Sequence, residues 1–178
     1  MQRIRKSFLL FFILFFFGLT YAEEPIKEVK LVRFSDADSM WILVDGRRLK
    51  LIVAGIDAPE EFRSRKLRMD SKRCHISQKH IRRLGRRATS YARSVLSEGK
   101  TIKVRLYRQE DTKVYGSIYL TDGSLYSEKL VKEGYACVSP GDINEKILNR
   151  LRSLLSEAKK KKKGLWKDFY KIMDCLCR

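Results

Sequence analysis

The alternation of apolar and polar positions predicts strands in the first third of the chain. Residues 29–43 are rich in Val, Ile, Leu and aromatic residues with a polar interruption at 35–39, and residues 49–56 form a further apolar run. Runs of this kind, bounded by turn residues, are typical of β-strands. Asp45-Gly46 favours a two-residue hairpin turn, because both central positions of that turn need positive φ. We therefore expect three consecutive strands joined by tight turns.

The rest of the chain combines further strands with helices. Residues 101–106 and 114–120 alternate as strands do, whereas apolar residues spaced by three and four predict a helix over 85–98. Helices are also expected over 125–132 and 143–163. Five strands with about three helices indicate a mainly β fold, a small barrel with helices packed outside it.

The segment 61–84 departs from this pattern. It is dense in Arg and Lys and shows little apolar periodicity. We interpret it as a basic loop.

The first residues have the composition of an export signal. Basic residues precede an apolar run over 8–19, and a small-residue ending follows at 20–22. This order is typical of a secretory signal peptide, and the run is shorter than the roughly 20 residues of a membrane-spanning helix. We predict a signal peptide at 1–22, a secreted or periplasmic protein, and no stable membrane insertion after cleavage.

The charge balance points to polyanionic partners. The chain carries 39 Lys and Arg against 21 Asp and Glu, a formal net charge of +18. A field of this sign attracts nucleic acid, lipopolysaccharide or an anionic membrane without choosing among them. The length fits one domain with a core of its own after the signal is removed, and we expect a monomer.

The cysteines predict disulfides. An exported chain with four cysteines allows three connectivities. One residue separates Cys175 from Cys177, so a direct bridge would be strained, and we expect both to pair with Cys74 and Cys137 or to stay partly free. A zinc site is the weaker alternative, because the CxC spacing and the two histidines do not complete a usual ligand pattern.

Two acidic clusters carry the candidate chemistry. The sequence Asp-Ala-Asp at 36–38 lies between the first two predicted strands, and Asp-Ala-Pro-Glu at 57–60 ends the third. The ends of consecutive strands can meet at one edge of a barrel and gather carboxylates of the kind that Ca²⁺ binds. Taken alone, either cluster would be interpreted as turn and strand-end residues.

Together, the two clusters resemble the staphylococcal nuclease family. That family has an Asp-Gly-Asp-Thr turn and then a strand ending in Gly-Ile-Asp-Ala-Pro-Glu, and residues 32–60 read VRFSDADSMWILVDGRRLKLIVAGIDAPE. Gly85 with Ala88, the pair Tyr115-Gly116, the segment LVKEGYA and the ending AKKKKKGLW follow in the family's order. The resemblance covers about residues 28–168 and leaves 169–178 as a Cys-containing C-terminal tail.

The resemblance implies a five-stranded OB-fold barrel and Ca²⁺-dependent hydrolysis of phosphodiester bonds in DNA and RNA. By position it implies that Asp38 and Asp57 are carboxylate ligands of Ca²⁺, with the backbone carbonyl of Ala58 as a third ligand. Glu60 would orient or deprotonate the attacking water. The metal would polarise the phosphoryl oxygen while Glu60 prepares the nucleophile.

The chain departs from the family at two arginines. The family has one arginine five residues before the Asp of Asp-Ala-Pro-Glu and another directly after Tyr-Gly, and these positions are Ile52 and Ser117 here. Arginine binds phosphate oxygens through two parallel hydrogen bonds, which neither Ile nor Ser can make. An arginine finger is worth roughly 10³ to 10⁵ in rate in phosphoryl transfer. The substrate pocket also changes, because residues 139–142 stand where the family has tyrosines.

Other basic residues are candidate replacements. Lys50 lies two residues before Ile52 and so faces the same way on the strand. The further candidates for contact with substrate are Arg63, Arg65, Lys113 and Tyr115.

Three functions are compatible with these features. The first is an exported nuclease with relocated cationic groups. The second is a catalytically inactive module that binds nucleic acid or another polyanion. The third is a structural or host-interaction protein in which the barrel displays the basic segment.

Overall fold

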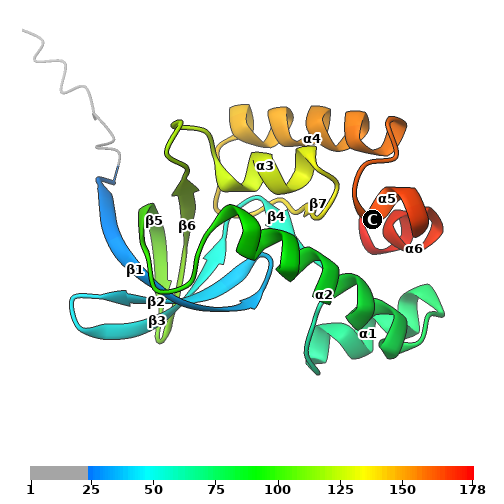
Figure 1. The fold of residues 1–178 in the computed structure, drawn as a ribbon, viewed down its shortest axis with the longest axis horizontal. Helices are drawn as coiled ribbons and strands as arrows, with labels where there is room; N and C mark the ends of the chain where they lie inside the picture. The colour runs from blue at the N-terminus through cyan, green and yellow to red at the C-terminus, as the bar shows by residue number, and fades with distance from the viewer. Residues whose placement is uncertain (1–23) are drawn as a thin grey trace, which may run out of the picture.

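A closed barrel of five strands forms the centre of the computed structural model, which describes residues 24–178. The strand order is β1-β2-β3-β6-β5 (Figure 1). The strands are β1 (Ile26–Asp36), β2 (Ser39–Val44), β3 (Arg47–Val53), β5 (Thr101–Glu110) and β6 (Lys113–Tyr119). Neighbours are antiparallel except β3 and β6, which are parallel. The predicted mainly β class and OB-fold barrel are confirmed, and the predicted signal peptide lies outside the described residues.

Alternating side chains build the barrel interior. One face of each strand is buried, as with Met40 and Ile42 in β2. The predicted Asp-Gly turn joins β2 to β3, and both Asp45 (φ 48°) and Gly46 (φ 75°) have the positive φ that this turn needs.

Six helices lie outside the barrel within residues 24–178. They are α1 (Arg65–Cys74), α2 (Gln78–Val95), α3 (Tyr126–Lys132), α4 (Glu145–Lys160), α5 (Leu165–Asp168) and α6 (Tyr170–Leu176). In Figure 1, α3 and α4 lie side by side above the barrel, and α1 and α2 extend to one side of it toward α5 and α6. Two short strands, β4 (Ile56–Asp57) and β7 (Cys137–Val138), pair as a separate sheet. None of the helices in this part of the chain is long and apolar enough to cross a membrane.

The interpretation of residues 61–84 as a loop was wrong. They contain α1 and the first turns of α2, and serines cap both helices: Ser64 Oγ accepts from the Leu67 N–H, and Ser77 Oγ accepts from the His80 N–H. Within α1, only Leu67 and Asp70 are buried. A helix that buries so little apolar surface has no apolar stripe for a periodicity to detect.

Two disulfides fasten the C-terminal tail. Cys74 is bonded to Cys175, and Cys137 is bonded to Cys177. The expected pairing of the two C-terminal cysteines with the two earlier ones is confirmed, and the part of the chain that the structure describes has no free cysteine for a zinc ion. The tail at 169–178 contains α6. The two bridges tie it to the end of α1 and to β7.

Candidate functional site

Backbone-to-side-chain hydrogen bonds hold the β1–β2 turn against the segment that follows β3. Asp38 Oδ2 accepts from the Ala58 N–H at 2.8 Å, and Asp36 Oδ1 accepts from the Glu61 N–H at 2.7 Å. The Asp38 carbonyl also accepts from the Val53 N–H at 2.9 Å. The two acidic clusters therefore lie together at one end of the barrel.

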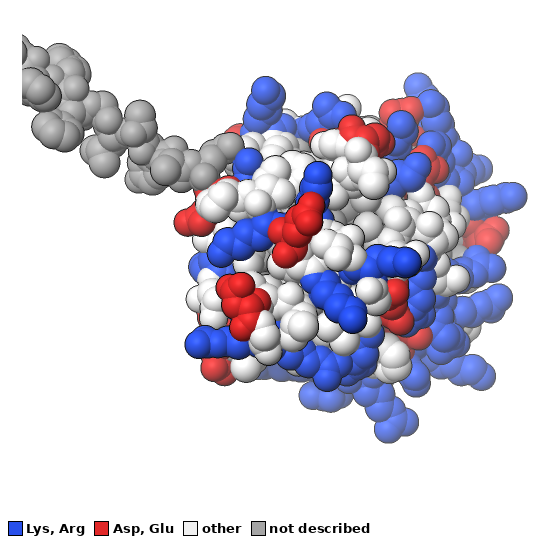
Figure 2. Space-filling model, turned by 60° about the vertical axis from the view of Figure 1, so that its left-hand side comes forward, with Lys and Arg blue, Asp and Glu red and all other residues white. Residues whose placement is uncertain are grey.

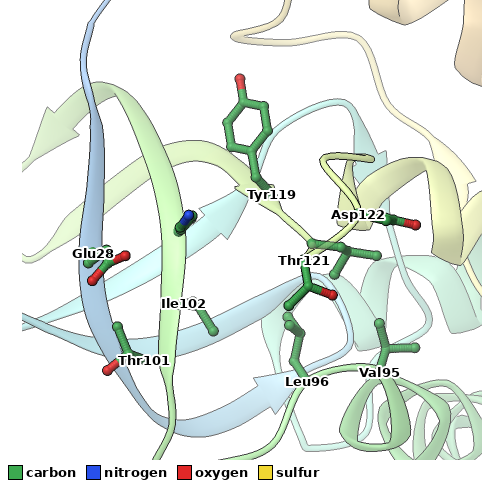
Figure 3. A pocket seen from close by; sticks show the side chains of 10 residues that line it. Glu28, Val95, Leu96, Thr101, Ile102, Tyr119, Thr121 and Asp122 are labelled. Atoms are coloured by element: carbon green, nitrogen blue, oxygen red, sulfur yellow. The ribbon is translucent and has the colours of Figure 1, made fainter.

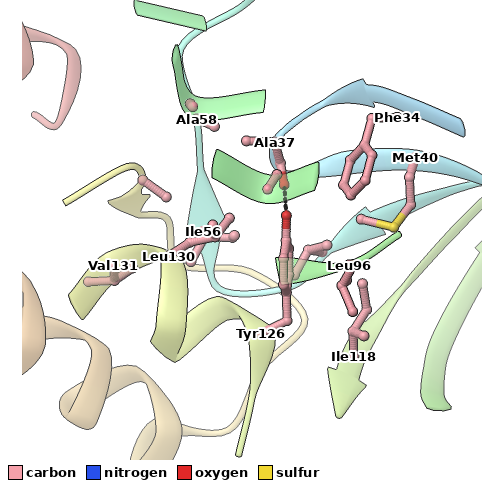
Figure 4. Packing of buried hydrophobic residues seen from close by; sticks show 14 of the residues in the cluster. Phe34, Ala37, Met40, Ile56, Ala58, Leu96, Ile118, Tyr126, Leu130 and Val131 are labelled. Atoms are coloured by element: carbon pink, nitrogen blue, oxygen red, sulfur yellow. Dashed lines mark hydrogen bonds between the residues drawn. The ribbon is translucent and has the colours of Figure 1, made fainter. Parts of the chain in front are cut away.

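A buried tyrosine fixes the same turn from below. Tyr126, at the start of α3, is fully buried in the core that contains Phe34 and Met40, and its hydroxyl donates to the Ala37 carbonyl at 2.7 Å (Figure 4). Burial raises the pKa of Tyr126 well above its usual value, so the hydroxyl stays a neutral donor. Ala37 is the middle residue of the acidic turn, so this bond positions the carboxylates on either side of it.

A lysine ammonium lies among the carboxylates. Lys66 Nζ is 3.2 Å from Asp57 Oδ1 and 3.6 Å from Glu60 Oε1. It is also 3.2 Å from Asp70 Oδ2, and it donates to the Ala58 carbonyl at 3.3 Å. Four oxygen-bearing groups, three from β4 and the turn after it and one from α1, therefore surround one positive charge.

The ionisation of these groups reflects crowding of negative charge. Burial raises the pKa of Asp38 to about 8, and the charge of Asp57 adds to that effect. Burial also raises the pKa of Asp57, although Lys66 opposes the shift. Burial alone would lower the pKa of Lys66, but the carboxylates of Asp57 and Asp70 outweigh it and raise that pKa. The ammonium is thus charged, and the cluster is one that stabilises a cation.

The same oxygens are of the kind that a hard cation takes. Ca²⁺ binds carboxylate and carbonyl oxygens, and Asp57 and Ala58 each present one to the Lys66 ammonium. Within residues 24–178, no three Asp, Glu, His or Cys side chains form a ready-made metal cluster. The Lys66 ammonium occupies this point, and the carboxylate and carbonyl oxygens around it are donors that fit Ca²⁺.

A basic cleft of about 260 Å³ adjoins Glu60. It is lined by Arg33, Ser35, Asp36, Lys50, Glu60, Phe62, Arg63 and Ser64. Of the residues predicted to contact substrate, Lys50 and Arg63 therefore lie in one cleft with Glu60. Sequence reasoning missed Arg33. The alternation in β1 is the signal that could have found it, because its neighbour Phe34 points into the core and Arg33 therefore points outward.

The other three predicted contacts do not line this cleft. Arg65 is the exposed first residue of α1. Lys113 is the exposed first residue of β6 and is the register partner of Lys50. Tyr115 lines a second cleft of about 260 Å³, which Ile52 also lines.

This second cleft contains an arginine that sequence reasoning missed. Arg108 pairs with Tyr115 across β5 and β6, and its guanidinium lies 3.9 Å from the centre of the Tyr115 ring. Asp142 accepts three hydrogen bonds of 2.8 to 3.2 Å from the guanidinium, and Glu110 forms a further ion pair with it. The predicted strand ended at residue 106, whereas β5 continues to Glu110 and carries Arg108 onto this face.

The two positions at which the resemblance predicts arginines carry no positive charge. Ile52 is half-buried and is the register partner of Tyr115. Ser117 is buried, and its Oγ accepts from the Tyr107 hydroxyl at 2.7 Å.

A third pocket, of about 460 Å³, lies apart from these clefts. It opens between the end of α2 and strands β1, β5 and β6, where Val95, Ile102 and Tyr119 line it (Figure 3). Its acidic residues are Glu28 and Asp122, and none of the predicted site residues lines it.

Basic side chains dominate the surface. On the face shown in Figure 2, Lys and Arg are densest along the right-hand and lower edges, and Asp and Glu are scattered among them. With a formal net charge of +18, the chain has a field that attracts polyanions.

A closed five-stranded barrel with two acidic clusters at one end and a basic cleft beside them matches the arrangement that the sequence motifs predict. The chain belongs to the staphylococcal nuclease family, because the model of that family, described as "Staphylococcal nuclease homologue", matches residues 50–168. This confirms the family that the sequence motifs predict.

Curated relatives agree with the family. The chain is 28% identical over 153 residues to a thermonuclease of Staphylococcus hyicus, a match that covers 84% of this chain and 80% of the relative. It is 29% identical over 131 residues to the endonuclease YhcR of Bacillus subtilis, covering 70% of this chain but only 10% of that protein. It is 24% identical over 140 residues to an uncharacterized endonuclease of Escherichia coli, covering 78% and 76% of the two chains.

Proposed function

We propose that this chain is an exported nuclease that hydrolyses phosphodiester bonds of DNA or RNA with Ca²⁺. One observation carries the proposal: Asp57 and Glu60 lie around the Lys66 ammonium at one end of the barrel, and Asp38 is held beside them by its hydrogen bond from the Ala58 N–H. Membership of a nuclease family supports the same conclusion. Export is supported by the composition of residues 1–22 and by the two disulfides.

Each acidic group has a role in this proposal. Asp38, Asp57 and the Ala58 carbonyl would hold Ca²⁺, which when bound supplies the charge that polarises a phosphoryl oxygen. Glu60 lines the basic cleft and also contacts Lys66, so its carboxylate lies between the cation position and the cleft. That place suits a group that orients a water molecule and accepts its proton.

The basic cleft supplies charge for the phosphate. Arg33, Lys50 and Arg63 line it together with Glu60. These residues would take over part of the work of the two missing family arginines. A lysine offers charge without a planar fork, so we expect slower turnover than in family members that keep both arginines.

The second candidate function is a module that binds nucleic acid or another polyanion without cleaving it. The environments of Ile52 and Ser117 favour this alternative, because neither position carries a charge and Ser117 is buried. The basic surface alone would suffice for such binding.

Incubation of the purified protein with single-stranded DNA or RNA and Ca²⁺ tests the proposal. We expect cleavage that Asp57→Ala abolishes. Activity that survives Asp57→Ala would show that another site or a contaminant is responsible. Binding that falls steeply with salt, without cleavage in either protein, would identify the binding module instead.

A further inference from the structure

The position of Lys66 in its helix is electrostatically unusual. The residue lies in the first turn of α1, directly after the cap Ser64 and Arg65, and that turn contains no acidic residue. The positive end of the helix dipole disfavours a cation there. Oxygen atoms outside the helix, from Asp57, Glu60 and the Ala58 carbonyl, stabilise the ammonium instead. Asp70, one turn later in α1, adds a further carboxylate.

The ammonium uses oxygens that a metal ion would need. Asp57 Oδ1 at 3.2 Å and the Ala58 carbonyl oxygen at 3.3 Å are its partners. Both groups are also proposed ligands of Ca²⁺. A divalent ion bound to them would lie within a few ångströms of the ammonium, and two such charges repel strongly in a partly buried site. The ammonium and a divalent ion would therefore compete for the same oxygens.

We propose that Lys66 is a built-in competitor for the divalent-cation site: its side chain occupies the carboxylate cluster until Ca²⁺ displaces it. This inference rests on the proposed function only for the identity of the metal ligands. The Lys66 side chain is 37% exposed, so it can withdraw into solvent without passing through the packed core.

Calorimetric titration of the purified chain with CaCl₂ tests the competition without any nuclease assay. Lys66→Met removes the charge and keeps the length of the side chain, and Lys72→Met, exposed on the same helix, is the matched control. We expect Lys66→Met to bind Ca²⁺ about tenfold or more tightly than the wild type, and Lys72→Met to match the wild type. Adding Asp57→Asn to Lys66→Met should remove the gain. Equal affinities in the wild type and Lys66→Met, or no binding in either, would overturn the proposal.

A second measurement needs no substitution and covers the case in which Lys66→Met fails to fold. Amine-reactive labelling followed by mass spectrometry reports how accessible each lysine is. We expect saturating Ca²⁺ to increase the labelling of Lys66 several-fold while the labelling of Lys72 stays constant. Unchanged labelling of Lys66 in the presence of bound Ca²⁺ would contradict displacement. Neither readout depends on cleavage, so the competition can fail while the nuclease proposal stands, and the reverse.

Discussion

Gly85 of α2 packs directly against the backbone of Glu60. A Cβ atom added to Gly85 would lie 2.3 Å from the Glu60 carbonyl oxygen and 2.5 Å from the Glu61 nitrogen. The lack of a side chain thus lets the buried face of α2 support the residue proposed to prepare the nucleophile. The family motif that contains Gly85 has a physical basis in this contact.

Gly85→Ala is expected to push the Glu60 segment away from α2. Forcing a methyl group against backbone atoms costs about 1 to 3 kcal/mol of stability, and a displacement of about 1 Å at the site can lower turnover by about 10²-fold. Urea unfolding and cleavage assays on the same preparation measure both effects. Ser90→Ala, which is exposed on the same helix, is the control. Equal behaviour of the two variants would show that the contact does not position Glu60.

The basic cleft predicts a specific change in salt dependence. Lys50→Met and Arg33→Met should each weaken binding of single-stranded DNA and reduce the slope of log affinity against log salt by about 0.7 per lost phosphate contact. Lys103→Met, which removes a charge from the separate pocket in Figure 3, should leave the slope unchanged. Fluorescence anisotropy over a range of salt concentrations measures this. Identical slopes for all three variants would mean that the cleft does not hold phosphate.

Glu98 predicts a pH dependence of stability away from the site. Its Oε1 accepts from the Phe34 N–H at 2.9 Å, and this bond, followed by contacts with Arg93, lowers the pKa of Glu98. A lowered pKa in the folded state contributes stability above the unfolded value of about 4.3, and that contribution disappears as the pH falls through the folded value. Because Glu98 is 39% exposed, we expect Glu98→Gln to lose at most about 1 kcal/mol at pH 7.

Urea unfolding at several pH values between 7 and 3 checks this expectation. The difference between Glu98→Gln and the wild type should shrink in acid. A difference that stays constant over that range would show that ionisation of Glu98 is not its source.

The disulfides predict that reduction loosens the acidic site from a distance. Cys74 ends α1, the helix that carries Lys66 and Asp70, and Arg73 pairs with Asp70 at 2.9 Å while donating to the Cys175 carbonyl at 2.7 Å. Loss of one bridge typically costs about 2 to 4 kcal/mol. The double variant of Cys74 and Cys175 to Ser should therefore unfold at lower urea and show faster amide exchange in α1. A variant that is destabilised but keeps wild-type exchange in α1 would rule out the link to the site.

Much of the barrel could be predicted from the sequence. The Asp-Gly turn and the alternation in β2 and β3 encode the hairpin locally, and consecutive strands bring the acidic clusters to one end. The parallel pairing of β3 with β6 has no local signal, since it depends on strand ends separated by α1 and α2.

The cationic part of the site was less predictable for a physical reason. Lys66 and Asp70 are one helical turn apart and form an ion pair, but that spacing has meaning only if 65–74 is a helix. The missing apolar stripe hid α1, and the caps Ser64 and Ser77 were the signals that could have found both helices. Arg108 was missed because its strand extends beyond the expected end.

Single-turnover cleavage of a short end-labelled DNA by Glu60→Gln, with Ca²⁺ or with EDTA, tests the central claim most directly. Glutamine keeps the shape of the side chain and removes the proton acceptor. The account predicts a rate about 10² to 10⁴-fold below that of the wild type in Ca²⁺, with DNA binding nearly unchanged and no cleavage by either protein in EDTA. A wild-type rate in Glu60→Gln, or cleavage that persists in EDTA, would contradict it.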